Sequence, residues 1–202
     1  PHRGFETVTY MLQGKFYHED FKGHKGEIGP GDVQWMTAGK GIMHSEIPAS
    51  YTEYSNGIQL WINLNSKNKL CEPKYQEFTS DKIPKVDVEN SKSSYIKVIS
   101  GEYNGVTGPV MSITSVHYYD IYLDKNDSIK IKVDKGKVNC FIYIHSGFEI
   151  KLLGKTVKKH QAAKVLKNSN DDEYLEITND SKDSGLTGFV IMLGHPLEEP
   201  VS

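Results

Sequence analysis

Hydrophobic and polar residues alternate in short stretches along most of the chain. Alternation with a two-residue period, enriched in β-branched and aromatic residues, is typical of strands with one buried face. It runs through residues 6–12, 57–64, 95–100, 118–123, 128–133, 140–145 and 188–193. Glycine-rich turn signals separate these stretches, and sustained helical spacing is absent from the sequence. Many short strands joined by turns predict an all-β protein built as a sandwich or barrel.

The two halves of the sequence resemble each other. The stretch from Tyr10 to Gly14 is similar to the stretch from Tyr143 to Gly147, and polar, glycine-containing sequence separates the halves between residues 82 and 108. A duplicated unit accounts for both the length and the number of strands. We therefore expect two tandem β-barrels, at residues 1–101 and 102–202.

Charge and composition exclude several classes of protein. Lysine and arginine total 24 against 26 aspartate and glutamate, a formal charge of −2, so a strongly basic surface for direct nucleic-acid binding is not expected. The longest uncharged stretches are only strand-sized, so no membrane span is expected. Cys71 and Cys140 are too few for a disulfide framework, which favours a reducing compartment. The sequence begins at Pro1 rather than methionine, which indicates a processed, truncated or incomplete product.

Histidine and glutamate in the first half suggest a metal site. His44 and Glu46 are two residues apart, so on a strand their side chains project from the same face. A neighbouring strand would bring His2 to the same interior. Imidazoles and one carboxylate, with coordination positions left open, are typical of non-haem iron and of related manganese, nickel and copper centres. The same spacing also describes a solvated strand face or a local hydrogen bond, and both interpretations stay open.

The remaining histidines are not expected to bind a metal ion. His18 and His24 fall in a polar, glycine-flanked segment that predicts a solvated loop. Four histidines of the second half are expected to be hydrogen-bonded or on the surface: His117, His145, His160 and His195.

Other side chains have both a structural and a functional interpretation. Trp35 and Trp61 are expected in the barrel core, with an aromatic wall for a planar ligand as the alternative. Arg3 is expected to pair with Glu6 or Asp32, and alternatively to orient an anionic substrate. The lysine-rich residues 155–167 predict a solvated strand edge, which lysine protects from pairing with other strands.

Eight segments distributed along the chain carry a resemblance to a known family. They are residues 1–10, 18–21, 30–39, 41–44, 59–64, 72–77, 98–101 and 194–201. In this order they resemble the pirin family of the cupin superfamily, strongly in the first half and more weakly between residues 104 and 188. The resemblance implies two cupin β-barrels that face each other, with one metal, usually iron, in the N-terminal barrel.

The resemblance also implies a ligand set. Pirins bind the metal through both histidines of a His-Pro-His-Arg-Gly motif and through the histidine and glutamate of a later His-x-Glu. The matching residues are His2, His44 and Glu46, and the histidine that would precede Pro1 is missing. The chain therefore resembles a pirin shortened at both ends, without the strands that precede the first histidine, and we expect weakened metal binding. General cupins carry a carboxylate at the place of Glu6, which makes Glu6 the leading substitute ligand.

The second half lacks the corresponding ligands. Shifting the first motif by the offset between the two tyrosine stretches places Lys135 and Asn139 where His2 and Glu6 would lie. We therefore expect one metal per chain at most, with iron(II) favoured and manganese, nickel, copper and zinc as alternatives.

Two functions are implied by the resemblance. One is a quercetin 2,3-dioxygenase-type oxidoreductase, in which a flavonol chelates the metal and Glu46 accepts the hydroxyl proton. The other is a non-enzymatic, iron-dependent transcription co-regulator that binds protein partners such as Rel-type transcription factors. A third interpretation is an inert barrel without metal. The resemblance implies a location in the cytoplasm, the nucleus or both.

Overall fold

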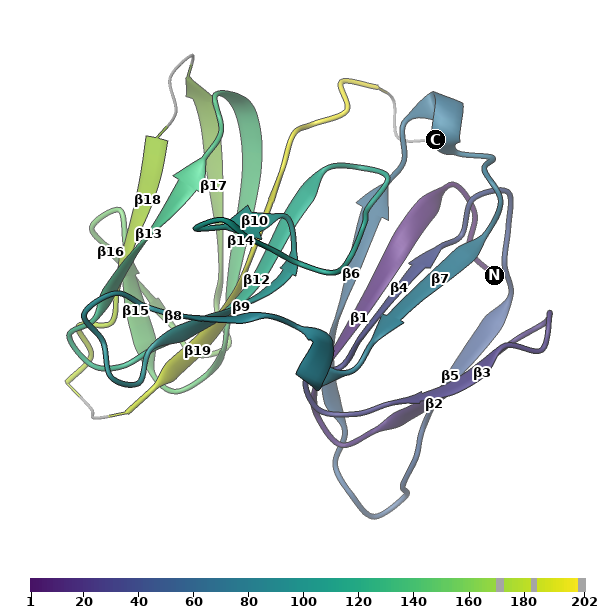
Figure 1. Ribbon diagram of the computed structural model, residues 1–202, viewed down its shortest axis with the longest axis horizontal. Helices are drawn as coiled ribbons and strands as arrows, with labels where there is room; N and C mark the ends of the chain where they lie inside the picture. The colour runs from purple at the N-terminus through teal and green to yellow at the C-terminus, as the bar shows by residue number, and fades with distance from the viewer. Residues whose placement is uncertain (170–172, 183–184, 200–202) are drawn as a thin grey trace. The chain divides into compact units, whose positions relative to one another are not determined.

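A computed structural model describes residues 1–169, 173–182 and 185–199 (Figure 1). These ranges contain nineteen strands and two short 3-10 turns, and within them no α-helix occurs, so the all-β prediction is confirmed. In the part of the chain that the structure describes, no helix has the length and apolar character needed to cross a membrane.

The chain divides into two compact units. The first comprises Pro1–Ile83 with the tail from Leu197, and the second comprises Pro84–Pro196. The boundary expected after residue 101 therefore falls inside the second unit. The reason is that β8 (Lys85–Asp87) and β9 (Tyr95–Ser100) are hydrogen-bonded into a sheet of the second unit.

Two antiparallel sheets build the first unit, and Figure 1 shows their strands from purple to blue. One sheet has the order β6-β1-β4-β7, and the other has the order β3-β2-β5. The strands of the first sheet are β1 (Phe5–Gln13), β4 (Val33–Thr37), β6 (Asn56–Asn63) and β7 (Lys74–Phe78). Those of the second are β2 (Phe16–Asp20), β3 (Lys25–Ile28) and β5 (His44–Pro48). The 3-10 turns η1 (Ser66–Asn68) and η2 (Ser80–Lys82) precede and follow β7.

Strand β1 is buried on both of its faces. On one face Val8 lies opposite Trp35 of β4, and both side chains are fully buried. This confirms Trp35 as a core residue. On the other face Thr7 and Thr9 are almost completely buried although they are polar. Since buried polar groups need hydrogen-bond partners, this second face points to a polar interior.

The second unit combines a six-stranded and a four-stranded antiparallel sheet. Their orders are β17-β14-β19-β12-β9-β8 and β13-β18-β15-β16. The further strands of the six-stranded sheet are β12 (Val116–Leu123), β14 (Gly136–Ser146), β17 (Ala162–Ser169) and β19 (Thr187–Gly194). The four-stranded sheet contains β13 (Ser128–Val133), β15 (Glu149–Leu152), β16 (Lys155–Lys158) and β18 (Glu173–Thr178). A short hairpin of β10 (Glu102–Tyr103) and β11 (Val106–Thr107) completes the unit.

Apolar side chains fill the interior of the second unit. Strand β13 shows the expected alternation, because Ile129, Ile131 and Val133 are buried while the residues between them are exposed. They pack in one cluster with fully buried residues of the six-stranded sheet, such as Ile142 and Phe189.

The histidines of the second unit have local partners, as expected. The buried His145 places its Nε2 atom 2.9 Å from Asp120 Oδ1. His117 Nδ1 lies 2.6 Å from the hydroxyl of Tyr119. His160 contacts the hydroxyl of Tyr143, and His195 is exposed.

The turn after β4 gives a first test of the fold. Gly39 has a φ of +50°, and a Cβ atom there would lie 2.0 Å from the carbonyl oxygen of Cys71. That oxygen already accepts a hydrogen bond from the backbone of Lys40. We expect Gly39→Ala to lower the free energy of unfolding of the first unit by about 2 to 4 kcal/mol, measured by urea denaturation, because backbone strain and a steric clash add.

Gly23→Ala is the matched control. Gly23 has a φ of +88° but no neighbouring atom within 4 Å of the added Cβ, so only the backbone strain applies. We expect a loss of about 1 kcal/mol there. Equal losses in the two variants would contradict the predicted clash with Cys71.

Candidate metal site

The first residues of the chain pair with the segment that leads into β5. An antiparallel bridge joins His2 and Ile42, with backbone hydrogen bonds of 2.8 and 3.0 Å. His44 follows Ile42 by two residues, and the ring centroids of His2 and His44 lie 4.9 Å apart. The structure thus brings these two histidines together at the start of β5.

The carboxylate of Glu46 points toward the other sheet of the unit. Its Oε1 atom accepts a hydrogen bond of 3.0 Å from the Thr9 hydroxyl, and its Oε2 atom accepts one of 2.8 Å from Gln59 Nε2. The indole nitrogen of Trp61 donates to Gln59 Oε1 at 3.0 Å, which directs the amide nitrogen of Gln59 toward Glu46. The polar face of β1 therefore serves to hold Glu46.

Burial favours the neutral form of both histidines. It is the main cause that lowers the pKa of His44 below 6.5, and the nearby Glu46 offsets this only in part. Burial also lowers the pKa of His2, followed by repulsion from His44. Neutral imidazole is the form that binds metal ions. His44 Nδ1 is buried, and within the described ranges it has no hydrogen-bond partner.

His2, His44 and Glu46 are of the residue types that bind transition metals, but their side chains do not converge on one point. Within the described ranges, no three histidine, cysteine, aspartate or glutamate side chains are grouped closely enough to hold a metal ion. His2 and His44 supply two adjacent neutral imidazoles, whereas both oxygens of Glu46 are engaged by Thr9 and Gln59. Each oxygen of Glu46 accepts one hydrogen bond and keeps a second lone pair, so Glu46 could bind a metal only if its side chain moved toward His2 and His44 while Thr9 and Gln59 still held it.

Glu6 lies on the wrong face of β1 to replace a missing imidazole. Thr9 points toward Glu46, and Glu6, three residues away, projects to the opposite face. There its fully buried carboxylate accepts a hydrogen bond of 2.7 Å from the Thr37 hydroxyl. The expectation that Glu6 substitutes as a ligand is therefore wrong.

Arg3 is exposed at the edge of this region. Its expected partner Asp32 instead accepts backbone hydrogen bonds of 2.8 Å from Gly29 and 2.7 Å from Ser80. The pairing with Asp32 is therefore wrong, and the anion-orienting alternative stays a prediction.

His18 contradicts the prediction of a solvated loop. It lies on β2 directly opposite Glu46, and only 3% of its surface is exposed. Its Nε2 atom is 2.8 Å from Glu77 Oε1, but without the geometry of a hydrogen bond, and Glu77 Oε1 accepts a hydrogen bond from Gln34 Nε2. The sequence carries no signal for this burial, because along β2 the apolar Tyr17 is exposed and the polar His18 and Asp20 are buried.

Asp20 and His24 continue this polar cluster. Asp20 is buried opposite His44, and it accepts hydrogen bonds from the backbone and the ring of His24 at 2.9 and 2.8 Å. The ring of Tyr75 lies between His18 and His24, at centroid distances of 6.0 and 5.8 Å. A buried polar cluster that the sequence did not predict therefore lies beside His44 and Glu46.

Trp61 contradicts the prediction of a core residue. It is 60% exposed, because it stands on β6, an edge strand of its sheet. The ring of Phe5 stacks on Trp61 at 4.9 Å, and both rings lie within 5.6 Å of the His2 ring. These two residues form an aromatic wall beside His2, which was the alternative interpretation.

Comparison with known proteins identifies the family. The family model described as Pirin matches residues 1–62. Human pirin is 40% identical over 206 aligned residues, which cover 100% of this chain and 67% of the human protein. The chain belongs to the pirin family.

Solved structures agree with this membership. A quercetin 2,3-dioxygenase from Acinetobacter baumannii superposes with a TM-score of 0.86 at 30% identity, over 100% of this chain and 68% of that protein. A Cupin 2 conserved barrel domain protein from Leptotrichia buccalis, with a TM-score of 0.50 at 12% identity over 94% of this chain and 73% of that one, shares the fold alone. The pirin-family chain spans between 61% and 71% of the length of its curated relatives.

His2 and His44 of the candidate site should titrate below pH 6.5 in the metal-free protein. Because their pKa values are lowered by folding, the unfolded chain takes up protons first as the pH falls. The stability that the neutral rings contribute is fully present above pH 6.5 and is lost as the pH falls toward their folded-state pKa. Heteronuclear NMR of the ring nitrogens measures the pKa values of His2 and His44. A titration midpoint at or above pH 6.5 for His44 would contradict the expected effect of burial.

Gly26 makes room for the ring of His18, and its substitution tests how closely that ring is confined. A Cβ atom at Gly26 would lie 2.2 Å from His18 Nε2, so the ring would have to leave Glu77. We expect Gly26→Ala to cost about 1 to 3 kcal/mol in urea denaturation and to shift the His18 ring signals.

Gly29→Ala provides the comparison for this variant. At Gly29 the nearest atom to an added Cβ is 3.5 Å away, an ordinary contact, so the change should stay within about 0.5 kcal/mol. If Gly26→Ala and Gly29→Ala lower the free energy of unfolding by the same amount, Gly26 does not confine the ring of His18.

Proposed function

We propose that this chain binds a transition metal at His2, His44 and Glu46. The observation that supports the proposal most directly is the pair of adjacent, partly buried imidazoles whose pKa values are lowered. Iron(II) is the favoured ion, because two imidazoles and a carboxylate with open positions suit it. Manganese, nickel, copper and zinc are the alternatives that the same ligands accept.

We further propose that the site serves a dioxygenase that acts on flavonols. A bound metal would supply open coordination positions and would lower the pKa of a chelating hydroxyl group. Glu46 would accept the hydroxyl proton, while Thr9 or Gln59 keeps hold of its second oxygen. The aromatic wall of Phe5 and Trp61 offers an apolar face on which a planar ring system can stack. Similarity to the A. baumannii quercetin 2,3-dioxygenase supports this substrate class.

A metal-dependent co-regulator is the second candidate function. Phe21 and Met43 are 58% and 57% exposed, and Trp61 adds a third large exposed side chain in the same unit. Exposed apolar side chains with a formal charge of only −2 suit a protein partner better than DNA. A co-regulator of transcription factors would act in the nucleus, whereas the dioxygenase would act in the cytoplasm.

Metal analysis tests the ligand assignment. Purified protein incubated anaerobically with iron(II) should retain metal at a ratio below or equal to one per chain, and His44→Ala should reduce retention at least tenfold. His160→Ala is the matched control, because it removes an exposed histidine from the other unit. A variant with a histidine added directly before Pro1 should bind more tightly. Stoichiometric metal that survives His44→Ala would place the site elsewhere.

Turnover separates the two candidate functions. The metal-loaded variant with the added histidine should consume oxygen with quercetin, and Glu46→Gln should slow this reaction about a hundredfold or more through loss of the proton acceptor. Metal content must be measured in parallel, so that loss of the ion is distinguished from loss of the base. Loaded protein without turnover would refute the dioxygenase and leave the co-regulator.

A further inference from the structure

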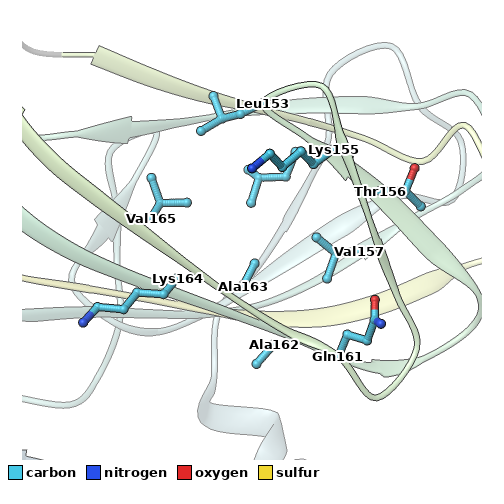
Figure 2. Close-up of a pocket in the computed structure, with 10 residues that line it drawn as sticks. Leu153, Lys155, Thr156, Val157, Gln161, Ala162, Ala163, Lys164 and Val165 are labelled. Carbon is cyan, nitrogen blue, oxygen red and sulfur yellow. The ribbon is translucent and has the colours of Figure 1, made fainter.

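A cavity of about 650 Å³ opens in the second unit, between β16 and β17 (Figure 2). Its volume falls within the range of small-molecule pockets, roughly 300 to 1,000 Å³. Apolar side chains from both strands and from the end of β15 line it, among them Leu152, Val157, Ala163 and Val165.

The cavity exists because two sheet edges diverge there. Strand β16 is the edge of the four-stranded sheet and pairs with β15, whereas β17 is the edge of the six-stranded sheet and pairs with β14. The turn between them is held by backbone hydrogen bonds, from Lys159 to Phe148 and from His160 to Ile144. Beyond this turn β16 and β17 are not paired with each other, so the opening leads to the apolar interior.

Lys155 lies on the inner face of β16. It is paired directly with the buried Leu152, and it is two residues before the buried Val157. Directly opposed residues of an antiparallel pair, and residues two apart on a strand, share one face. Figure 2 shows the Lys155 side chain extending into the opening. Within the described ranges its ammonium group has no ion-pair partner.

Lys164 lines the same opening but points away from it. Its Nζ atom lies 5.5 Å from the ring centroid of Phe141, while Ala163 and Val165 on either side pack against the core. Figure 2 shows its side chain leaving the cavity. The opening, whose lining is largely apolar apart from Thr156 and Gln161, therefore receives one directed positive charge.

We infer that this cleft binds a monoanionic amphiphile, a free carboxylate with an unbranched apolar chain. The apolar chain would lie against Val157, Ala163 and Val165, which removes apolar surface from water on both sides. The carboxylate would pair with Lys155 in a charge-assisted hydrogen bond. A neutral chain would leave the ammonium beside hydrocarbon, and a cationic one would be repelled. The inference concerns the second unit and does not depend on the proposed metal site.

A purely structural role for Lys155 makes a different prediction. Inward-pointing charges protect exposed sheet edges from pairing with other chains. If Lys155 had only this role, the cleft would show no saturable preference for a carboxylate.

Titration with dodecanoate below its aggregation concentration tests the inference on the metal-free full chain. Binding should be saturable in calorimetry, and in NMR spectra the methyl signals of Val157, Ala163 and Val165 should shift with the same dissociation constant. Lys155→Gln should weaken binding about fivefold or more, because it removes the charge but keeps most of the side-chain length. Lys164→Gln, the matched control, should change binding less than twofold. Dodecanol should bind more weakly than dodecanoate, and dodecyltrimethylammonium should not bind.

Three results would overturn the inference. They are absence of saturable dodecanoate binding, equal weakening by the two lysine substitutions, and shifts confined to methyl groups of the first unit. Thermal unfolding of Lys155→Gln and Lys164→Gln checks that both variants are folded. Both lysines are exposed, so we expect the substitutions to leave the core intact.

Discussion

The two-sided burial of β1 is the constraint on which the candidate site depends. A strand presents alternate residues to opposite faces, so a strand buried on both faces must satisfy two environments with one sequence. One face of β1 carries Val8 and Tyr10 into an apolar layer, and the other carries Thr7 and Thr9 toward β5. The hydroxyl of Thr9 then meets Glu46, which couples the two sheets of the first unit through a polar contact.

Hydrogen bonds between its members stabilise this polar interior, although some of its buried polar atoms have no partner in the part of the chain that the structure describes. Leaving a buried donor or acceptor without a partner costs about 1 to 3 kcal/mol, so a chain of partners is needed. Trp61 orients Gln59, Gln59 and Thr9 hold Glu46, and Gln34 and His18 meet at Glu77. Not every member has a partner, because both ring nitrogens of His18 and the Nδ1 atom of His44 lack a hydrogen bond within the described ranges. At His2 and His44 burial lowers the pKa, which favours the neutral imidazole that binds metal ions.

The two units use the same class of sheet for different interiors. In the second unit isoleucine, valine and leucine fill the space between the sheets, and the buried polar residues, such as Asp120 and His145, lie outside this apolar cluster. In that unit the unpaired edges of β16 and β17 create the opening, whereas in the first unit the space between β1 and β5 is polar and the other face of β1 is apolar. A binding site can therefore form either among the side chains between two sheets or at an edge where the two sheets separate.

The sequence by itself determined the all-β class, several of the strands, the family and the neighbourhood of the site. Alternation located β13, β14 and β19, and the spacing of His44 and Glu46 placed both on one face, because a strand's period is local and needs no knowledge of its partners. The tertiary structure alone decided which face met which environment. Glu6 has a carboxylate that could bind a metal, but its side chain projects from the face of β1 that points away from Glu46. Trp61 is exposed because β6 is an edge strand, which depends on the order of strands in the sheet. His18 became buried because β2 pairs with β5, and Lys155 faces inward because β16 pairs with β15. Strand order and register depend on contacts between distant residues, which no local pattern contains.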